Sequence, residues 1–265
     1  MGRRRLDAEL VRRGLAGTRA EAQEAVREGH VTVRGAPATK STTLVGTDEA
    51  LVVAGPARLF VSRGGEKLAA ALDAFAIDPA GRGCLDAGAS TGGFTDCLLQ
   101  RGARHVVALD VGYGKLAWEL RTDPRVTLME KTNVRGLDPV LLPYRPSLLT
   151  ADVSFISLRL VVGPLIQAAE SLADLVLLIK PQFEARRDDV ERGGVVRDPD
   201  AWRRAIEGVA DGTRAAGAGN LGLIVSPVTG PAGNVEFVLH AQVAGEGVTL
   251  DVDGVIDAAR KGSTS

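Results

Sequence analysis

The sequence predicts an α/β protein: a Rossmann-like, mostly parallel sheet of seven strands, preceded by a small α+β module. A short apolar run ending in Asp86 leads into a glycine-rich turn and then a helical pattern, which is the opening unit of a doubly wound sheet. Apolar runs and helical patterns then alternate toward the C-terminus. Upstream, residues 1–54 carry two short helical patterns and a hairpin pattern.

Composition indicates an ordinary globular protein. The 265 residues are 45% hydrophobic and 25% charged, with a net charge of −1. No apolar run approaches the roughly 20 residues that span a bilayer. No apolar segment follows Arg3-Arg4-Arg5, so we expect no signal peptide and a cytoplasmic location. Cys84 and Cys97 fit no metal spacing and are expected to be buried and reduced. We expect no metal.

The charge is unevenly distributed. Residues 1–40 carry a net charge of +4, which leaves −5 for the rest of the chain. A basic head suggests a module that meets phosphate. A solvated arginine-rich face would give the same count, so charge alone leaves both readings open.

The N-terminal residues follow a recognisable order. A helical pattern over 6–14 ends at Gly14, Thr18 can cap a second helix that ends at Gly29, and residues 30–35 alternate as a strand. This order resembles the S4 domain, an RNA-binding module. The resemblance implies phosphate contacts from the basic helical face, namely Arg4, Arg5, Arg12, Arg13, Arg19 and Arg27. The alternative is a small helical cap without a partner.

The glycine-rich turn has a distinctive spacing. Asp86-x-Gly88-x-x-x-Gly92 differs from the dinucleotide fingerprint and resembles motif I of methyltransferases that use S-adenosylmethionine (SAM). Asp110 ends the second predicted strand, where a carboxylate suits a ribose hydroxyl pair. The predicted cofactor-binding residues are Asp86, Gly88, Ala89, Ser90, Gly92, Gly93, Phe94, Thr95, Asp110, Val111, Asn133 and Asp152. A glycine-rich turn with no ligand is the alternative.

The remaining elements complete the predicted sheet. Helical patterns cover 69–75, 160–172 and 200–216, and the later strands cover 105–110, 125–130, 147–152, 174–180, 221–226 and 234–239. The predicted domains are an S4-like module over 1–54, a linker over 55–61 and a catalytic domain over 62–240, with a tail of uncertain structure over 241–265.

Four charged residues stand out. Lys67 lies near the N-terminus of a predicted helix, where a cation is unfavourable. Asp152 and Lys180 end predicted parallel strands, the edge at which open α/β sheets bind ligands. Glu236 lies in the last strand. Each residue alone is more often part of a structural ion pair, but the four together indicate a site.

The order of motifs resembles the TlyA family, which comprises S4-linked relatives of FtsJ-type RNA 2′-O-methyltransferases that are sometimes described as haemolysins. The motifs are Ser62-Arg63-Gly64-Gly65-Glu66-Lys67-Leu68, Asp86 to Thr95, Asp152-Val153-Ser154-Phe155-Ile156-Ser157-Leu158, Lys180-Pro181-Gln182-Phe183-Glu184 and Gly193 to Pro199. The resemblance implies SAM-dependent 2′-O-methylation of cytidine in 16S or 23S ribosomal RNA by a Lys67-Asp152-Lys180-Glu236 tetrad. Two departures are Ser147, where relatives usually have Asp, and the 185–192 loop, which lacks the relatives' lysines and glycines.

The implied chemistry suits these side chains. A ribose hydroxyl is a poor nucleophile, and a lysine that has lost its proton can serve as base. Two neighbouring lysines repel each other, while Asp152 and Glu236 would orient their amines. We expect a monomer acting on ribosomal RNA or subunits, without stable membrane insertion. A non-catalytic RNA-binding or assembly factor and a haemolysin remain the alternatives; the target nucleotide and subunit stay open.

Overall fold

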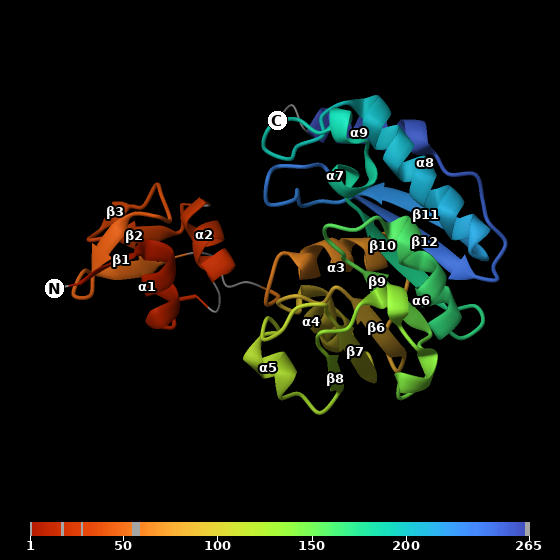
Figure 1. Ribbon diagram of the computed structural model, residues 1–265, viewed down its shortest axis with the longest axis horizontal. Coiled ribbons are helices and arrows are strands. Elements are labelled where there is room, and N and C mark those ends of the chain that lie inside the picture. The colour runs from red at the N-terminus through yellow and green to blue at the C-terminus, as the bar shows by residue number, and fades with distance from the viewer. Residues whose placement is uncertain (1, 17–18, 28, 55–58, 263–265) are drawn as a thin grey trace. The chain divides into compact units, whose positions relative to one another are not determined.

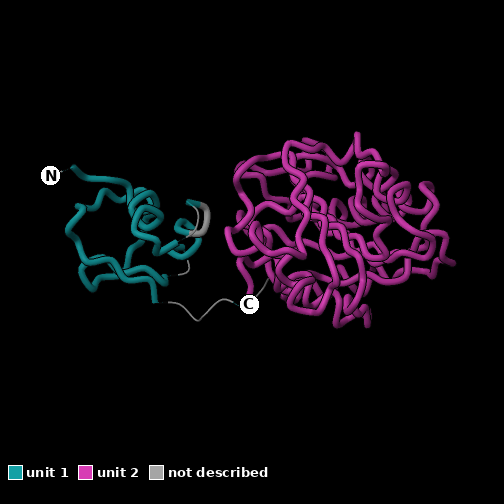
Figure 2. The backbone as a smooth tube through the Cα atoms, turned by 90° about the horizontal axis from the view of Figure 1, so that it is seen from below, with its two compact units in different colours: residues 1–59 teal, residues 60–265 magenta. Residues whose placement is uncertain are grey.

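The chain forms two compact units, residues 1–59 and 60–265 (Figure 2). The computed structural model describes residues 2–16, 19–27, 29–54 and 59–262. The predicted cap at Thr18 and residues 55–58 of the predicted linker lie outside these ranges. Each unit has its own hydrophobic core.

The N-terminal unit packs two helices against small sheets. Its core contains Leu6, Leu10, Val26 and Val31, all buried. The strand of three arginines was not predicted, because its side chains do not alternate; it forms by antiparallel backbone pairing with the strand over 44–46. The elements are β1 (Arg3–Arg5), α1 (Leu6–Arg12), α2 (Arg19–Arg27), β2 (Val31–Val33), β3 (Ala36–Pro37), β4 (Leu44–Gly46) and β5 (Leu51–Val53).

The larger unit is built on a seven-stranded sheet with the order β11-β12-β10-β9-β6-β7-β8 (Figure 1). The pairs among β6 to β10 are parallel, whereas β12 runs antiparallel to both β10 and β11. The strands are β6 (Gly83–Ala87), β7 (His105–Leu109), β8 (Val126–Met129), β9 (Leu148–Ala151), β10 (Asp174–Ile179), β11 (Ala218–Val225) and β12 (Phe237–Val243). The predicted fold class is confirmed.

Helices cover both faces of this sheet (Figure 1). They are α3 (Gly64–Ala74), α4 (Gly93–Gln100), α5 (Trp118–Arg121), α6 (Val162–Ala168), α7 (Pro181–Glu184), α8 (Pro199–Ala215) and α9 (Val252–Gly262). Short 3-10 turns are η1 (Val134–Gly136), η2 (Pro139–Leu141), η3 (Leu158–Leu160) and η4 (Arg187–Asp189). The predicted tail thus contains the end of β12 and helix α9.

Strand β10 shows why the sheet lies between two layers of helices. Successive side chains of a strand point to opposite faces. Leu175, Leu177 and Ile179 belong to the core that includes α6, α8 and α9, while Val176 and Leu178 belong to the core that includes α3 and α4. All five are buried, as expected for a central strand covered on both sides. Cys84 and Cys97 are buried free thiols, as predicted.

Small residues bring the starts of α3 and α4 into close contact. A Cβ on Gly93 would lie 2.2 Å from Ser62 Oγ and 2.8 Å from Gly65 N. A Cβ on Gly65 would lie 2.2 Å from the Phe60 ring. Phe60, inside the predicted linker, is therefore buried in the larger unit. This packing fixes α3, and with it Lys67, beside the glycine-rich turn.

Candidate active site

Sheet topology brings three of the four predicted residues to one edge. Asp152 follows β9 and Lys180 follows β10, two strands that run parallel side by side. Glu236 precedes β12, which enters the sheet at that edge because it is antiparallel to β10, with Phe237 opposite Ile179. Lys67 comes from α3 on the sheet face.

The four side chains form two ion pairs. Lys67 Nζ lies 2.5 Å from Glu236 Oε2, and both residues are buried. Lys180 Nζ lies 2.5 Å from Asp152 Oδ1 and donates a hydrogen bond to Ser154 Oγ at 2.9 Å. The unfavourable position of Lys67 in its helix thus has a tertiary explanation: its amine faces a buried carboxylate.

Electrostatics link the two pairs. Burial raises the pKa of Glu236 above its usual value, because desolvation disfavours the carboxylate. The positive charges of Lys67 and Lys180 oppose this rise in pKa, and the negative charge of Asp152 adds to it. All three therefore lie close enough to act on Glu236, and the predicted residues form one cluster of two cations and two carboxylates.

A cavity of about 840 Å³ opens beside this cluster. Its size suits a small-molecule cofactor. Among the predicted cofactor-binding residues, those that line it are Gly88, Ser90, Asp110, Val111, Asn133 and Asp152. Asp152 belongs to both the cluster and the cavity wall, so it connects the two.

The glycine-rich turn contributes Gly88 and Ser90 to the cavity wall, and the other six of its eight predicted residues do not line the cavity. Gly88 has φ +87°, and a Cβ there would lie 2.5 Å from the Asp152 carbonyl oxygen. Asp86 is fully buried and accepts hydrogen bonds from Thr95 Oγ1 at 2.7 Å and Thr150 Oγ1 at 3.1 Å. Burial raises the pKa of Asp86 to about 7. The predicted residues outside the cavity wall are Asp86, Ala89, Gly92, Gly93, Phe94 and Thr95.

Asp110 is held rigidly at the end of β7. Its Oδ2 accepts from Ser90 N at 2.9 Å, and its Oδ1 accepts from Gly112 N at 2.6 Å and from Lys115 Nζ at 3.3 Å. Each carboxylate oxygen has two lone pairs, so Oδ2 keeps one acceptor position. Asp110 lines the cavity, together with Ser90 and Lys115, two of the residues that donate to it.

Several cavity residues were not predicted from the sequence. Lys115 pairs with Asp110, Ser154 accepts a hydrogen bond from Lys180, and Phe155 and Phe183 line the same cavity. Phe155 is 92% exposed, has φ +64° and packs against Phe183 at a ring distance of 5.1 Å. Ser154, Phe155 and Phe183 follow Asp152 or Lys180 by two or three positions, and this closeness in sequence could have indicated them.

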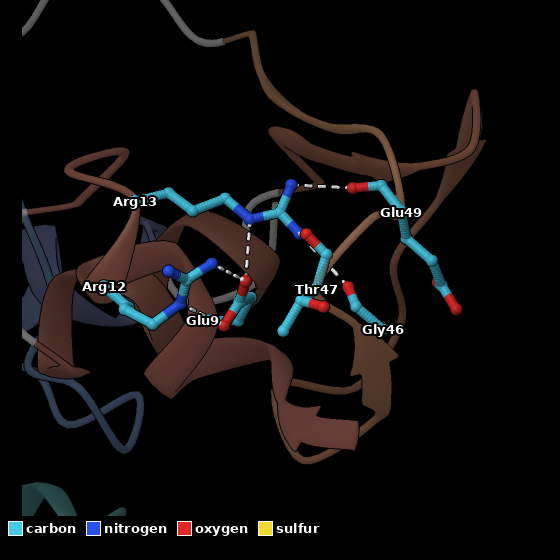
Figure 3. Close-up of polar contacts among 6 residues, drawn as sticks. All are labelled: Glu9, Arg12, Arg13, Gly46, Thr47 and Glu49. Atoms are coloured by element: carbon cyan, nitrogen blue, oxygen red, sulfur yellow. Dashed lines mark hydrogen bonds and ion pairs between the residues drawn. The ribbon is translucent and has the colours of Figure 1, made fainter. Parts of the chain in front are cut away.

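In the N-terminal unit, the predicted RNA-contacting arginines differ in their surroundings. Arg13 donates to the carbonyl oxygens of Glu49 at 2.7 Å, Thr47 at 3.0 Å and Gly46 at 3.1 Å, and to Glu9 Oε1 at 2.8 Å (Figure 3). Arg12 donates from Nε and Nη2 to Glu9 and stays 46% exposed. Arg13 is thus a brace between α1 and the 46–49 turn, whereas Arg12 remains available at the surface.

The other arginines lie on the surface of the same unit. Arg5 and Arg19 both bond to the buried carboxylate of Asp7, at 2.8 and 3.1 Å. These hydrogen bonds hold the pKa of Asp7 well below its usual range, although burial opposes them. Arg27 pairs with Glu24, and Arg4 is exposed on β1.

Each of the two units matches a known protein family. The FtsJ-like methyltransferase family matches residues 60–243, and the S4 domain matches residues 4–50. The 16S/23S rRNA (cytidine-2′-O)-methyltransferase TlyA of Mycobacterium tuberculosis is 50% identical over 260 residues, covering 98% of this chain and 97% of that protein. The chain belongs to the TlyA family of FtsJ-like methyltransferases.

Solved structures agree with this TlyA-family assignment. A protein of Streptococcus thermophilus, described as a proposed hemolysin, has a TM-score of 0.80 and 36% identity, with 98% of this chain and 97% of that chain covered. A protein of Listeria monocytogenes, described as a proposed SAM-dependent methyltransferase, has a TM-score of 0.50 at 13% identity, covering 69% of this chain and 99% of that one. The second likeness concerns the fold alone.

Two further observations bear on this TlyA-family chain. Within the described residues, no group of three or more His, Cys, Asp and Glu side chains could hold a metal ion. Over the same part of the chain, no helix is long and apolar enough to cross a membrane.

Proposed function

We propose that this chain transfers a methyl group from SAM to the 2′-hydroxyl of a cytidine in 16S or 23S ribosomal RNA. The observation that carries the proposal is the Lys180–Asp152 ion pair at the wall of the cavity, with the Lys67–Glu236 pair beside it. The M. tuberculosis relative supports the substrate class. We expect the protein to act in the cytoplasm, where ribosomes are found.

The cavity residues fit the cofactor. Gly88 allows the backbone to approach Asp152 within a space that any side chain would fill. Asp110 would accept from a ribose hydroxyl at the free position of Oδ2, and the Lys115 amine, whose side chain is 50% exposed, can move aside. When bound, SAM would supply an electrophilic methyl group on a sulfonium.

The tetrad would prepare the RNA hydroxyl. Lys180, after losing one proton to solvent, would take the proton of the 2′-hydroxyl as the oxygen attacks. The oxygen would gain the methyl group, and the sulfonium of SAM would leave as the thioether of S-adenosylhomocysteine. Asp152 would orient the Lys180 amine, and its negative charge would stabilise the ammonium that forms when the amine takes the proton. Lys67 and Glu236 hold the neighbouring charges in fixed places, so that substrate positioning supplies much of the rate.

The N-terminal unit would hold the RNA. Arg4, Arg5, Arg12, Arg19 and Arg27 lie at its surface, and a +4 head attracts phosphate. The module's match to S4 supports RNA as its partner. We expect the protein to work as a monomer without a metal.

Mapping of 2′-O-methyl groups tests the proposal. Purified 30S and 50S subunits that lack the modification would be incubated with the full-length protein and SAM. We expect a new 2′-O-methylcytidine in at least one subunit RNA. Methylation of a base, or no methyl transfer by folded protein to either subunit, would contradict the proposal.

A further inference from the structure

The two segments that carry Asp152 and Lys180 leave the sheet side by side. Strands β9 and β10 pair in parallel as far as Ala151 and Leu177, and Asp152 N still donates to Ala87 O of β6 at 2.9 Å. Residues 153–158 then lie beyond the end of β9. The 152–158 loop also contains Phe155 in a left-handed conformation, φ +64°, which is strained for a bulky residue. Such a conformation persists where surrounding contacts hold it. The sheet holds this loop at Asp152, so contacts outside the sheet are needed to position its far end.

Glu184 makes that contact. It is the last residue of α7, the single turn that follows Lys180. Its Oε2 accepts from Ser157 Oγ at 2.5 Å, and its Oε1 accepts from Leu158 N at 2.6 Å. Both carboxylate oxygens thus bind the far end of the 152–158 loop. Ser157 Oγ in turn accepts from Arg159 N at 3.2 Å and caps η3.

Burial of the Glu184 carboxylate is energetically unfavourable. The Glu184 side chain is 2% exposed, and burial raises its pKa above the usual value. Arg159 Nε is 3.5 Å away and 52% exposed, so it offsets this cost weakly. A neutral residue would pack here without desolvating a charge. Glu184 does not line the cavity, so it acts through the residues that it holds.

We infer that Glu184 is a positioning residue, which clamps the 152–158 loop to the 180–184 segment and so keeps Asp152 against Lys180. The inference rests on the proposed function. Two further contacts span the same segments: the Lys180–Ser154 hydrogen bond and the Phe155–Phe183 ring contact. The two segments are therefore joined at one end by the Lys180–Asp152 ion pair and at the other end by the Glu184 contacts, with these two contacts in between.

Steady-state kinetics of Glu184→Ala and Glu184→Gln test the clamp with full-length protein and ribosomal subunits. Glu184→Ala should lower kcat by roughly 10- to 100-fold, because small displacements of reacting groups are costly, while KM for the subunit changes less. Glu184→Gln should recover part of kcat, since the amide oxygen can still accept from Leu158 N, whereas Ser157 Oγ already accepts from Arg159 N and Nε. Ser157→Ala, which removes one clamp contact, should give a smaller loss.

Asp174→Asn is the matched control. Asp174 is a carboxylate at the other end of β10, bonded to Arg82 and His240. Its substitution should lower the melting temperature without lowering kcat. If Glu184→Ala lowers kcat no more than Asp174→Asn, the inference is overturned; should Glu184→Ala fail to fold, Ser157→Ala decides by the same comparison. Absence of methyl transfer by the wild-type protein would instead contradict the proposed function.

Discussion

At the scale of single residues, the site depends on pairing each lysine with one carboxylate. The sequence indicated Asp152 and Lys180 through their places at strand ends, and Lys67 through its unfavourable place in a helix. Family resemblance supplied the role of Glu236. The pairing itself could not be predicted, because Lys67 and Glu236 are 169 residues apart and meet only when β12 enters antiparallel to β10. Glu184 was missed for the same reason: its partners lie in another loop.

Substitutions of Lys180 distinguish a role in proton transfer from a role of its positive charge. Lys180→Ala should lower kcat by at least about 100-fold, the range typical of a lost general base, with SAM affinity changed far less. Lys180→Arg keeps the positive charge but cannot give up its proton, so it should be nearly as inactive. Single-turnover methyl transfer and SAM calorimetry measure the two quantities. Substantial activity in Lys180→Arg would mean that Lys180 contributes charge and not proton transfer.

Asp86 should make stability depend on pH. Its folded-state pKa of about 7 lies above the unfolded value near 4, so the folded protein favours the protonated carboxyl. This contribution is fully present below about pH 4 and is lost as pH rises through about 7. Asp86→Asn removes the charge, and should therefore raise the free energy of unfolding relative to wild type more at pH 8 than at pH 5, by at most a few kcal/mol. Urea denaturation at both pH values measures the difference; an equal effect at both would place the ionised carboxylate in the folded state.

At the scale of elements, several helices and strands form through packing or backbone pairing that the periodicity of the sequence does not show. Strand β1 was missed because three arginines carry no alternation, and backbone pairing alone forms it. Helix α9 was missed although Val252, Val255, Ile256 and Ala259 have helical spacing, since a glycine-containing stretch separates them from the last strand. The predicted helix over 160–172 is shorter, with its ends taken by a 3-10 turn and a loop. Buried apolar strands such as β10 were predicted closely, because their pattern is continuous.

Helix α1 provides a matched pair of substitutions. Arg13→Glu removes the brace to the carbonyl oxygens of the 46–49 turn and brings a second carboxylate near Glu9, so it should destabilise the N-terminal unit. Arg12→Glu also brings a carboxylate near Glu9, but it keeps the Arg13 bonds to the 46–49 turn, so it should destabilise the unit less than Arg13→Glu while weakening RNA binding. Circular dichroism melting and RNA binding at several salt concentrations distinguish the two. Equal RNA binding by wild type and Arg12→Glu would remove Arg12 from the RNA-contacting surface.

At the scale of the whole molecule, the basic N-terminal residues and the candidate active site belong to different units. The tetrad and the cavity lie within residues 60–265, whereas the +4 charge lies within residues 1–40. Composition and the order of motifs predict a separate N-terminal module, and each unit has its own core. The position of the boundary was less accessible, since burial of Phe60 depends on its contact with Gly65.

A chain beginning at Leu59 tests the division. It retains Phe60 and hence the packing of Gly65 on α3, so it should fold and bind SAM. It should lose most methyl transfer to ribosomal subunits, because the basic unit that neutralises phosphate is absent. Full-length binding should weaken with rising salt, and Arg12→Glu should lower the slope of that dependence by about one. Methyl transfer by the shortened chain at the full-length rate, at physiological salt, would show that RNA is held by the larger unit and that the N-terminal arginines serve another purpose.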